Sequence, residues 1–470
     1  MQYIGKTPAH AQVKKGGDDL AMNILQVNTS DTGGGAEAIA MMLHRKYRRS
    51  GHNAWLAVGY KSLPDNHIVH LPPHLAYCDV WVRRWIELTQ KIPCIKQARG
   101  AGIIRALCEW KERWYQAKAY RLGHEHFHFP ATSRLLKTPP TLPELIHCHN
   151  LHGNYFDLRM LPCLSRKLPM VLTLHDAWLL SGHCAHSFDC ERWKTGCGQC
   201  PDLSIPPAIQ RDATASNWRK KQAIYAKSRV YVATPSNWLM QKVQQSILAP
   251  AVIESRVIPN GIDLAVFHEA ENKCAVRKSL NLPKTSRILL FMAHGIQDNP
   301  WKDFQTMQRA LVLLEKKMTE SSLLFVVLGK LPGEAEQHFP MKSKARMVTH
   351  QSDPAVIARY YQAADVYIHA AKADTFPTTV VEALACGTPV VATAVGGILE
   401  QVEHGQTGFL LPPGDSEAMA TAIHQILQNQ SLQQAMSEKA RQAASCRFDA
   451  NRMVADYLNW YQEILETYHL

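Results

Sequence analysis

The stretch that decides the fold is "DVYIHAAKADTFPTTVVEALACGTPVVATAVGG", residues 365–397. It begins with an apolar run typical of a buried strand, passes through a polar loop, and enters an apolar segment that favours a helix from about Thr378. Gly387 is placed to end that helix, and a second apolar strand pattern follows at once. Strand, loop, helix and strand in this order predict a parallel β-α-β unit of an α/β fold.

Short apolar runs, each followed by a loop and a helix-like segment, recur along the chain. They lie at residues 23–28, 52–59, 144–150, 170–176, 229–236, 287–295, 323–330, 365–371 and 388–397. Runs without strict alternation, spaced by helices, are typical of parallel strands buried on both faces. We therefore predict two doubly wound, Rossmann-like domains.

Residues that favour a turn mark the boundary between these domains. Pro259 and the Asn260-Gly261 pair interrupt a strand-like run in "RVIPNGID", residues 256–263. The predicted units are, in order, a disordered extension at 1–21, a first domain at 22–257, a second domain at 258–450, and a final amphipathic helix at 451–470 that crosses back to the first domain.

Composition narrows the class of protein. Of 470 residues, 46% are hydrophobic and 20% are charged, as in ordinary globular proteins. No apolar run approaches the roughly 20 residues that a membrane span needs, and the first 21 residues lack the apolar core of a signal peptide, so we expect a cytoplasmic protein. The formal net charge of +12 indicates an anionic partner: nucleic acid, sugar nucleotide or an anionic membrane surface.

Two acids in the opening stretch, Asp374 and Glu382, are placed to form a ligand site. Ligands of a doubly wound sheet bind at the carboxyl ends of the strands, where loops and helix N-termini converge. Asp374 would lie in the mouth and Glu382 about one turn into the helix, beside the backbone amides of Thr378 and Thr379. Hydroxyl acceptors beside an anion-binding helix end suit a sugar nucleotide. The structural alternative is a loop acid or helix cap at 374 and a solvated helical residue at 382.

A run of three glycines, Gly33, Gly34 and Gly35, lies directly between a predicted strand and a predicted helix. Such a run lets the backbone approach a phosphate closely, and the helix N-terminus favours negative charge. The G-x-G-x-x-G spacing is absent, which disfavours NAD. The alternative is a tight strand-to-helix turn.

Several motifs, in order along the chain from residue 23, resemble retaining glycosyltransferases of the family-4 class. They are "NTSDTGGGAEAIA" (28–40), "TLHDAW" (173–178), "TPSNW" (234–238), "VIPNGID" (257–263), the D/E-x7-E pair of acids at 374 and 382, and "GTPVVATAVGGILEQVEHGQTGFLLPPGD" (387–415). Residues 174–201, "LHDAWLLSGHCAHSFDCERWKTGCGQCP", resemble a bacterial subgroup that builds exopolysaccharide, colanic-acid-like or capsular repeat units. The resemblance implies the GT-B fold, with an acceptor-binding first domain and a donor-binding second domain facing a cleft.

The resemblance also implies roles for single residues. Glu382 would hold the ribose hydroxyls, and Asp374, where the family usually has Glu, would face the donor sugar near its anomeric carbon. Lys302 would offset charge building on the leaving diphosphate, a role that then needs no catalytic metal. His175, with Asp176, resembles a pair whose histidine contacts the donor sugar and phosphate; a histidine at a strand end is otherwise structural. The implied catalytic set is Asp374, His175 and Lys302, and the implied nucleotide-binding set is Gly34, Gly35, Lys302, Phe376, Thr378, Thr379 and Glu382.

The surroundings of Lys302 depart from the family pattern. Family members often have Arg shortly before this lysine and Gly after it, whereas Trp301 and Asp303 flank it here. An acid beside a phosphate is unfavourable unless it points away. The alternative for Lys302 is a solvated lysine.

A cysteine cluster lies within the segment that resembles the subgroup. Four thiolates at the spacing C-x5-C-x6-C-x2-C would satisfy a tetrahedral structural zinc site, and the closing C-x2-C has metal-knuckle spacing. The alternative is a loop with free thiols. The four candidate ligands are Cys184, Cys190, Cys197 and Cys200.

A basic, tryptophan-bearing segment at 81–121 predicts a helix at a membrane interface. Its apolar face would carry Ile103, Leu107, Trp110 and Trp114, and its basic residues include Arg105, Lys111, Arg113 and Lys118. The alternative is a core-facing helix with a solvated basic side. Many members of the class that the chain resembles use lipid-linked acceptors and dock peripherally on membranes, which explains the positive charge better than nucleic acid does.

The resulting hypothesis is a retaining hexosyltransferase. It would move a sugar from a UDP- or GDP-sugar to a hydroxyl of a lipid-linked saccharide or polysaccharide, on the inner face of the bacterial cytoplasmic membrane. The alternatives are a glycosyltransferase-like binding or scaffold subunit that has lost catalysis, and a sugar-nucleotide epimerase of the same fold.

Overall fold

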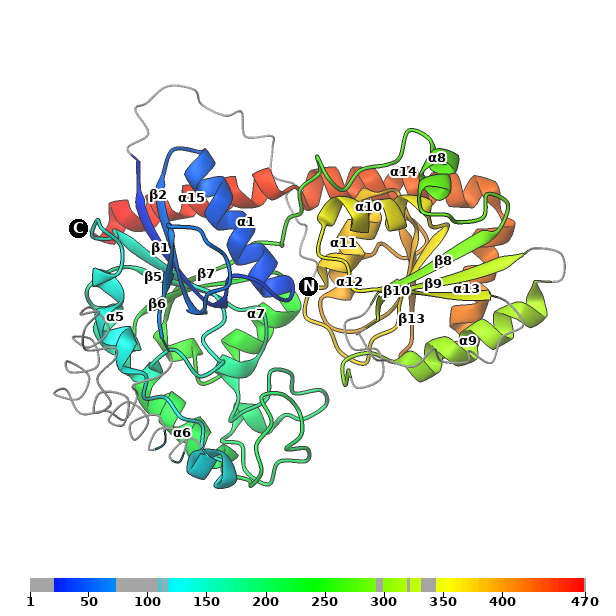
Figure 1. The fold of residues 1–470 in the computed structure, drawn as a ribbon. Coiled ribbons are helices and arrows are strands. Elements are labelled where there is room, and N and C mark those ends of the chain that lie inside the picture. Colours follow the sequence, from blue (N-terminus) through cyan, green and yellow to red (C-terminus); the bar gives the residue numbers. More distant parts are fainter. Residues whose placement is uncertain are drawn as a thin grey trace, which may run out of the picture.

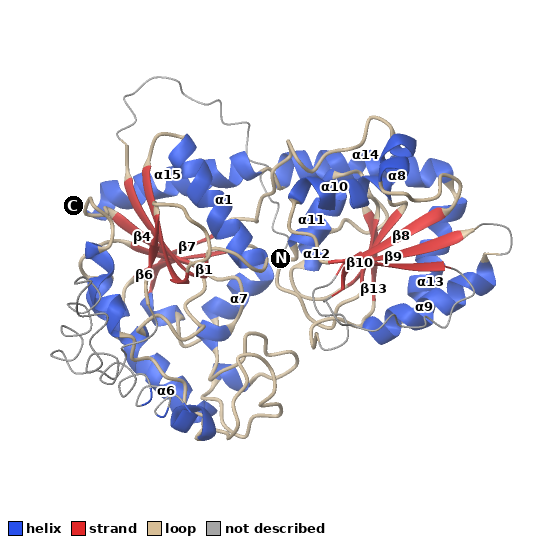
Figure 2. Cartoon of the chain, in the orientation of Figure 1, coloured by secondary structure: helices blue, strands red, loops and turns tan. Residues whose placement is uncertain are grey.

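The computed structural model describes residues 21–72, 110, 114, 117–292, 299–318, 322–330 and 344–468. Two α/β domains lie side by side, each built around one parallel sheet (Figures 1 and 2). Successive buried residues of a strand belong to different apolar cores: Ile24 packs into one cluster and Leu25 into another. Both faces of the sheet are therefore buried, which explains the continuous apolar runs.

The sheet of the first domain has the strand order β3-β2-β1-β4-β5-β6-β7. Its strands are β1 (Asn23–Ser30), β2 (Asn53–Tyr60), β3 (Ile68–His70), β4 (Leu145–Cys148), β5 (Met170–Thr173), β6 (Val230–Thr234) and β7 (Val252–Val257). Its helices include α1 (Gly35–Arg49), α5 (Leu161–Leu164), α6 (Thr214–Tyr225) and α7 (Asn237–Gln244). The strand order reverses between β1 and β4, so ligands are expected beyond the carboxyl ends of these two strands.

The sheet of the second domain has the order β10-β9-β8-β11-β12-β13. Its strands are β8 (Arg287–Met292), β9 (Leu323–Lys330), β10 (Lys344–Thr349), β11 (Val366–His369), β12 (Val390–Thr393) and β13 (Gly408–Leu411). Its helices include α8 (Lys273–Ser279), α9 (Phe304–Lys317), α10 (Pro354–Ala363), α11 (Thr378–Ala385), α12 (Ile398–Gln401), α13 (Ser416–Gln428) and α14 (Gln430–Arg447). Here the order reverses between β8 and β11.

The sequence analysis did not predict four of the strands: β3, β7, β10 and β13. These are the four edge strands of the two sheets. They are short or carry charged residues, as in "VIESRV" of β7, whose residues are partly exposed. An edge strand pairs on one side only, and the polar or charged residues of β3, β7 and β10 break the apolar pattern. The short β13, "GFLL", is apolar and mostly buried but was not predicted.

The chain crosses between the domains at two adjacent places. The amide of Ile262 donates to the Phe448 carbonyl, and the amide of Ala450 donates back to the Ile262 carbonyl, both at 2.9 Å. A Cβ on Gly261 would stand 2.7 Å from the Ala450 backbone, so only glycine permits this approach. The predicted turn at 259–261 therefore packs directly against residues 448–450, where the chain returns to the first domain.

The final helix, α15 (Ala450–Tyr468), packs on the sheet of the first domain (Figure 1). Its buried stripe recurs every three or four residues: Met453, Val454, Tyr457, Trp460, Tyr461 and Ile464. The Tyr461 hydroxyl lies 2.6 Å from His147 Nδ1 and 3.0 Å from the Tyr47 hydroxyl. The Tyr457 hydroxyl lies 2.8 Å from Thr173 Oγ1. Polar contacts therefore fix where this apolar helix sits.

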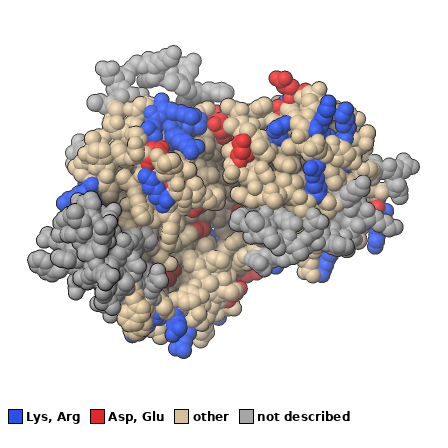
Figure 3. Space-filling view, in the orientation of Figure 1, with Lys and Arg blue, Asp and Glu red and all other residues tan. Residues whose placement is uncertain are grey.

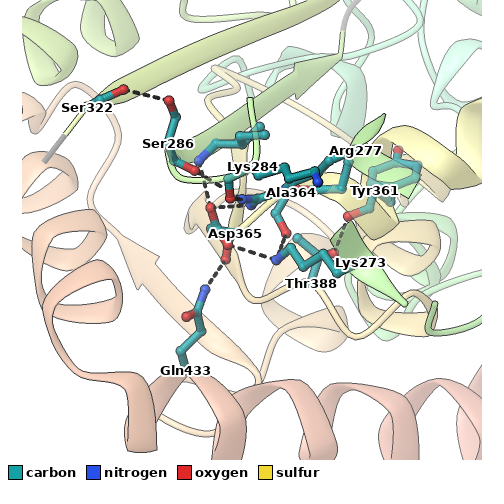
Figure 4. A network of polar contacts seen from close by, with 12 residues as sticks. Lys273, Arg277, Lys284, Ser286, Ser322, Tyr361, Ala364, Asp365, Thr388 and Gln433 are labelled. Atoms are coloured by element: carbon teal, nitrogen blue, oxygen red, sulfur yellow. Dashed lines mark hydrogen bonds and ion pairs between the residues drawn. The ribbon is translucent and has the colours of Figure 1, made fainter. Parts of the chain in front are cut away.

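A polar network behind β11 holds the second domain together (Figure 4). The Asp365 carboxylate accepts from Lys273 and Arg277 of α8 at 2.8 Å each, and from the Ile288 amide at 2.7 Å. Burial opposes ionisation, but the two cations outweigh it and lower the pKa of Asp365. Gln433 of α14 donates to the Asp365 carbonyl at 3.0 Å. The network thereby fixes the start of the strand that leads to Asp374.

Within the described ranges, no helix is both long and apolar enough to cross a membrane. Most of the predicted interfacial segment, 81–121, lies outside the described residues. Of its apolar face, Trp110 and Trp114 are described, with exposed fractions of 67% and 49%.

Candidate functional site

A cavity of about 370 Å³ lies between the two domains. Its lining comes from the carboxyl ends of strands in both sheets and from two helix N-termini. The lining residues are Gly35, Ala36, Glu37, Asn150, His175, Asp176, Pro235, Asn260, Lys302, Asp374, Thr375, Phe376, Pro377, Thr378 and Thr379. Figure 3 shows this face of the molecule hollowed where the two domains meet.

Two helix N-termini face each other across the cavity. α1 begins at Gly35 after the Gly34 N-cap, and α11 begins at Thr378 after the Pro377 N-cap; neither cap supplies a side-chain hydrogen bond. A Cβ on Gly35 would lie 3.9 Å from the Thr378 side chain. The first amides of both helices are thus available to one ligand, and both helix dipoles favour an anion there.

The glycine pair Gly396-Gly397 supports the loop that carries Asp374. A Cβ on Gly396 would stand 1.9 Å from the Asp374 carbonyl oxygen, and a Cβ on Gly397 would stand 2.0 Å from that of Thr375. Gly396 also has φ of +53°, in the region that favours glycine. Larger residues at either position would push this loop out of place.

The second-domain wall of the cavity is built on an ion pair. Lys302 Nζ lies 2.9 Å from Asp374 Oδ2 and 3.1 Å from His369 Nε2, while His369 Nε2 lies 3.1 Å from the same carboxylate oxygen. Burial opposes ionisation of Asp374, but Lys302 and the His369 hydrogen bond outweigh it and hold its pKa well below the usual range. Burial and Lys302 lower the pKa of His369 to about 4, so this ring is neutral at pH 7.

These contacts exclude one of the alternatives for Lys302. The side chain is 13% exposed and paired, so it is not a solvated lysine. Its neighbour Asp303 points away from the cavity: its carboxylate accepts from the Thr306 amide at 3.1 Å and caps α9. The adjacent acid therefore does not oppose an anion beside Lys302.

Glu382 lies in the second turn of α11, outside the lining of this cavity. The Tyr361 hydroxyl donates to Glu382 Oε2 at 3.0 Å. Burial raises the pKa of Glu382 to about 7, although that hydrogen bond works in the opposite direction. Phe376 lines the cavity and packs edge-on against Phe448.

Histidines form a network behind the first-domain wall, and His175 is the member of this network that lines the cavity. His175 follows β5 and lies 3.1 Å from His149, which follows the adjacent strand β4. Asp176 accepts from His152 at 2.8 Å and from the Trp178 amide at 2.8 Å. Burial lowers the pKa of His175 to about 4. Burial also opposes the charged form of His152, but Asp176 outweighs it and raises the pKa of His152.

The cysteine-rich segment reaches the second domain through aromatic rings. The described residues contain no group of three or more His, Cys, Asp or Glu placed to hold a metal ion, and all four cysteines are free thiols. The zinc site at these four cysteines stays a prediction. Phe188 stacks on Trp301 of the second domain with ring centroids 5.5 Å apart, and His186 stacks on Trp238 of α7 at 5.3 Å.

A carboxylate from the second domain also closes the interface. Glu400 of α12 accepts from the amides of Asn237 and Trp238 at 2.8 Å each, so it caps the N-terminus of α7 in the first domain. A helix cap supplied by the other domain fixes the relative position of the two walls.

Several residues of the cavity network were not anticipated from the sequence: Gln26, His149, His152, Asn150, Asn260 and His369. A signal was present for some of them. "IHCHNLHGN", residues 146–154, places polar side chains at the end of a strand, and Gln26 stands alone in the apolar run "NILQVN". A polar residue inside a buried strand needs a partner, and that requirement points to a network.

Comparison with known proteins agrees with this architecture. Residues 272–443 match the family model described as "Glycosyl transferases group 1". The chain is 21% identical over 462 residues to the putative colanic acid biosynthesis glycosyl transferase WcaC of Escherichia coli K12, covering 94% of this chain and all of WcaC. It is 24% identical over 358 residues to the putative teichuronic acid biosynthesis glycosyltransferase TuaC of Bacillus subtilis 168, covering 75% of this chain and 80% of TuaC.

Among solved structures, HepE of Anabaena in complex with UDP and glucose superimposes with a TM-score of 0.61. The identity is 18%, and the match covers 94% of this chain and all of the HepE chain. The predicted α/β fold class, GT-B with two Rossmann-like domains, is confirmed.

Proposed function

We propose that this chain, which carries a glycosyl transferase group 1 domain at residues 272–443 within a GT-B fold, transfers a sugar from a nucleoside-diphosphate sugar to a hydroxyl acceptor. The observation that carries the proposal is the convergence of three anion-binding elements on one cavity. The N-termini of α1 and α11 face each other there, and Lys302 lines the same space. A diphosphate is the part of a sugar nucleotide that such a site would bind.

The groups in the cavity suit stabilisation of the leaving group. In the proposed reaction the acceptor oxygen bonds to the anomeric carbon, the bond from that carbon to the phosphate oxygen breaks, and the leaving diphosphate takes the acceptor proton. This front-face displacement retains the anomeric configuration. Lys302 and the two helix N-termini would stabilise the charge that develops on the diphosphate. Asp374 and His175, on opposite walls, would position the sugar between them.

We assign the ribose contact to Glu382, one turn inside α11. Its carboxylate has the acceptors that two ribose hydroxyls need, and Tyr361 already orients one of its oxygens. Thr378 and Thr379, at the start of the same helix, line the diphosphate cavity. One short helix would then bind both the ribose and the phosphates of the donor.

The acceptor proposal is a lipid-linked or polymeric saccharide in bacterial surface polysaccharide synthesis. It is supported by the similarity to WcaC and TuaC, whose names place them in colanic acid and teichuronic acid biosynthesis. The net charge of +12 and the exposed Trp110 and Trp114 support docking on an anionic membrane. Flotation with phosphatidylglycerol vesicles against phosphatidylcholine vesicles tests the docking, and equal recovery with both would contradict it.

The donor proposal is tested by thermal stabilisation with UDP-, GDP- and dTDP-sugars, because a ligand that binds the folded state raises apparent stability. We expect one nucleotide series to stabilise the wild type and to lose most of its effect on Glu382→Gln. The matched control is Glu438→Gln, an exposed glutamate of α14, which should behave as wild type. Stabilisation by no series contradicts the proposal, and binding without transfer to any acceptor favours the scaffold alternative.

A further inference from the structure

A chain of hydrogen bonds runs from the buried centre of β1 to the cavity. Gln26 is fully buried, and its Nε2 lies 3.2 Å from His149 Nε2. His149 Nδ1 in turn lies 3.1 Å from His175 Nε2. The two imidazole planes are 20° apart, with ring centroids separated by 5.3 Å. Gln26 lies in β1, and His149 and His175 follow β4 and β5; the three strands are adjacent in the sheet.

Gln26, at the buried end of this series of hydrogen bonds, determines which group donates and which accepts in each bond. Gln26 Nε2 also lies 3.2 Å from the Ala40 carbonyl oxygen, which can only accept. The amide nitrogen must therefore face both Ala40 and His149, and it donates to each. Reversing the amide would place its oxygen against the Ala40 carbonyl. In the observed orientation Gln26 Oε1 is buried and has no hydrogen-bond partner among the described residues, which costs free energy of folding.

The position of each ring hydrogen then follows in turn. His149 Nε2 accepts from Gln26, so a neutral His149 carries its hydrogen on Nδ1 and donates it to His175 Nε2. His175 Nε2 is thereby occupied as an acceptor, and a neutral His175 carries its hydrogen on Nδ1. Burial keeps both rings neutral: it holds the pKa of His149 well below its ordinary value and lowers that of His175 to about 4.

His175 lines the cavity, and the described residues form no hydrogen bond with its Nδ1. We propose that Gln26 and His149 are positioning residues that fix His175 as the Nδ1–H tautomer, so that His175 donates a hydrogen bond to the bound sugar nucleotide. In this arrangement His175 has no free lone pair in its ring and does not serve as a base. The inference rests on the proposed function for the identity of the ligand, but the tautomer itself is independent of it.

The tautomer is measured directly by ¹⁵N NMR of protein labelled at histidine. Comparison with His175→Asn identifies the His175 signals among those of the 23 histidines. We expect a protonated Nδ1 and an unprotonated Nε2 in the wild type. Gln26→Glu has nearly the same shape but presents an acceptor to His149, so it should reverse the chain and move the His175 hydrogen to Nε2. A wild-type spectrum with the hydrogen on Nε2 overturns the proposal.

A pair of substitutions at the mouth of the cavity tests donation without disturbing the core. The amide nitrogen of Asn can take the place of Nδ1, whereas that of Gln takes the place of Nε2. We expect His175→Asn to keep the Michaelis constant for the donor within about threefold, and His175→Gln to raise it about tenfold. Equal effects of the two substitutions, or a smaller effect of Gln than of Asn, overturn the donation step.

The positioning role has a test of its own. Gln26→Glu should raise the donor Michaelis constant about as much as His175→Gln, and His149→Asn should rescue activity relative to His149→Leu, because its amide can still donate to His175 Nε2. Unchanged donor affinity in Gln26→Glu overturns this role. A wild type with the Nδ1–H tautomer that binds no sugar nucleotide would instead contradict the proposed function and the donation step with it.

Discussion

The two walls of the cavity lie at the carboxyl ends of two similar parallel sheets, yet different contacts hold their functional groups. In the first domain, neutral hydrogen bonds that start at the buried Gln26 hold His175 through His149, and Asp176 beside it is paired with His152. The second-domain wall is an ion pair between Lys302 and Asp374 beside a neutral histidine. Directional hydrogen bonds fix the orientation of a side chain, whereas an ion pair sets the electrostatic potential in the cavity. We therefore expect the first to govern how the donor is oriented and the second to govern how fast the bond breaks.

The largest expected effect is on the charged wall. Lys302→Ala removes the cation beside the leaving diphosphate and leaves Asp374 with the neutral His369 in place of a charged partner, so kcat should fall about a hundredfold or more. Steady-state kinetics with the donor identified by thermal stabilisation measures this. The control is Lys372→Ala, an exposed lysine on the same loop as Asp374. A loss of less than threefold in Lys302→Ala, or an equal loss in Lys372→Ala, would show that the ion pair is structural.

A second expected effect is a pH dependence of donor binding. With a pKa of about 7, Glu382 is mostly protonated at pH 6 and mostly ionised at pH 8. Only the carboxylate accepts from both ribose hydroxyls, so donor affinity should rise about tenfold between these pH values. Calorimetric titration measures it, and Glu382→Gln should abolish the slope. A donor affinity in the wild type that does not change with pH would contradict the assignment of Glu382 to the nucleotide site.

The ion pair between Lys302 and Asp374 should also make the free energy of unfolding depend on pH in the acid range. The pKa of Asp374 is depressed in the folded state, so its contribution is present above the pKa of the unfolded chain and is lost as pH falls toward the folded value. Asp374→Asn should therefore cost about 2 kcal/mol at pH 7, and the difference from wild type should shrink below about pH 4. Urea unfolding at several pH values measures this difference. A constant difference across that range would mean that Asp374 is not paired.

The hydrogen bonds that α15 forms with the buried sheet behind the first-domain wall should depend less on pH. Tyr461→Phe removes the hydroxyl that lies between His147 and Tyr47, which should destabilise the protein by about 1–2 kcal/mol without a pH slope between 6 and 8. Urea unfolding reports the cost, and Tyr120→Phe, at an exposed tyrosine, is the control. An equal loss of unfolding free energy in both variants would show that the buried hydrogen bonds of Tyr461 do not stabilise the fold.

The smallest effect is expected at the contact that holds the walls together. Glu400→Ala removes the interdomain cap of α7 and should cost about 1 kcal/mol, with Glu438→Ala as the exposed control. Differential scanning calorimetry measures the loss. If Glu400→Ala matches its control, the aromatic contact between Phe188 and Trp301 holds the interface without it.

Sequence reasoning located the second wall better than the first. Asp374, Thr378 and Thr379 were anticipated from their place between a strand pattern and a helix pattern, whereas Lys302 was anticipated only from the family resemblance. The cavity brings all four together. His175 was anticipated as well, but the residues behind it were not. Gln26 and His149 lie 123 positions apart in the chain, and their contact exists only because β1 and β4 are paired in the sheet. The cysteine spacing suggested a zinc site, which stays a prediction; in the fold the thiols of Cys184, Cys190 and Cys200 lie close enough to interact electrostatically.

By itself, the sequence determined the α/β fold, the two domains and the buried central strands, since apolar runs between helices can be buried in few other ways. It also determined which segments carry the polar groups at the strand ends. Only the tertiary structure decided the four edge strands, the pairing of Lys302 with Asp374, and the direction of the hydrogen bonds that end at His175. These depend on contacts between residues far apart in the chain, whose distances and orientations arise only once both sheets have formed and the domains have met.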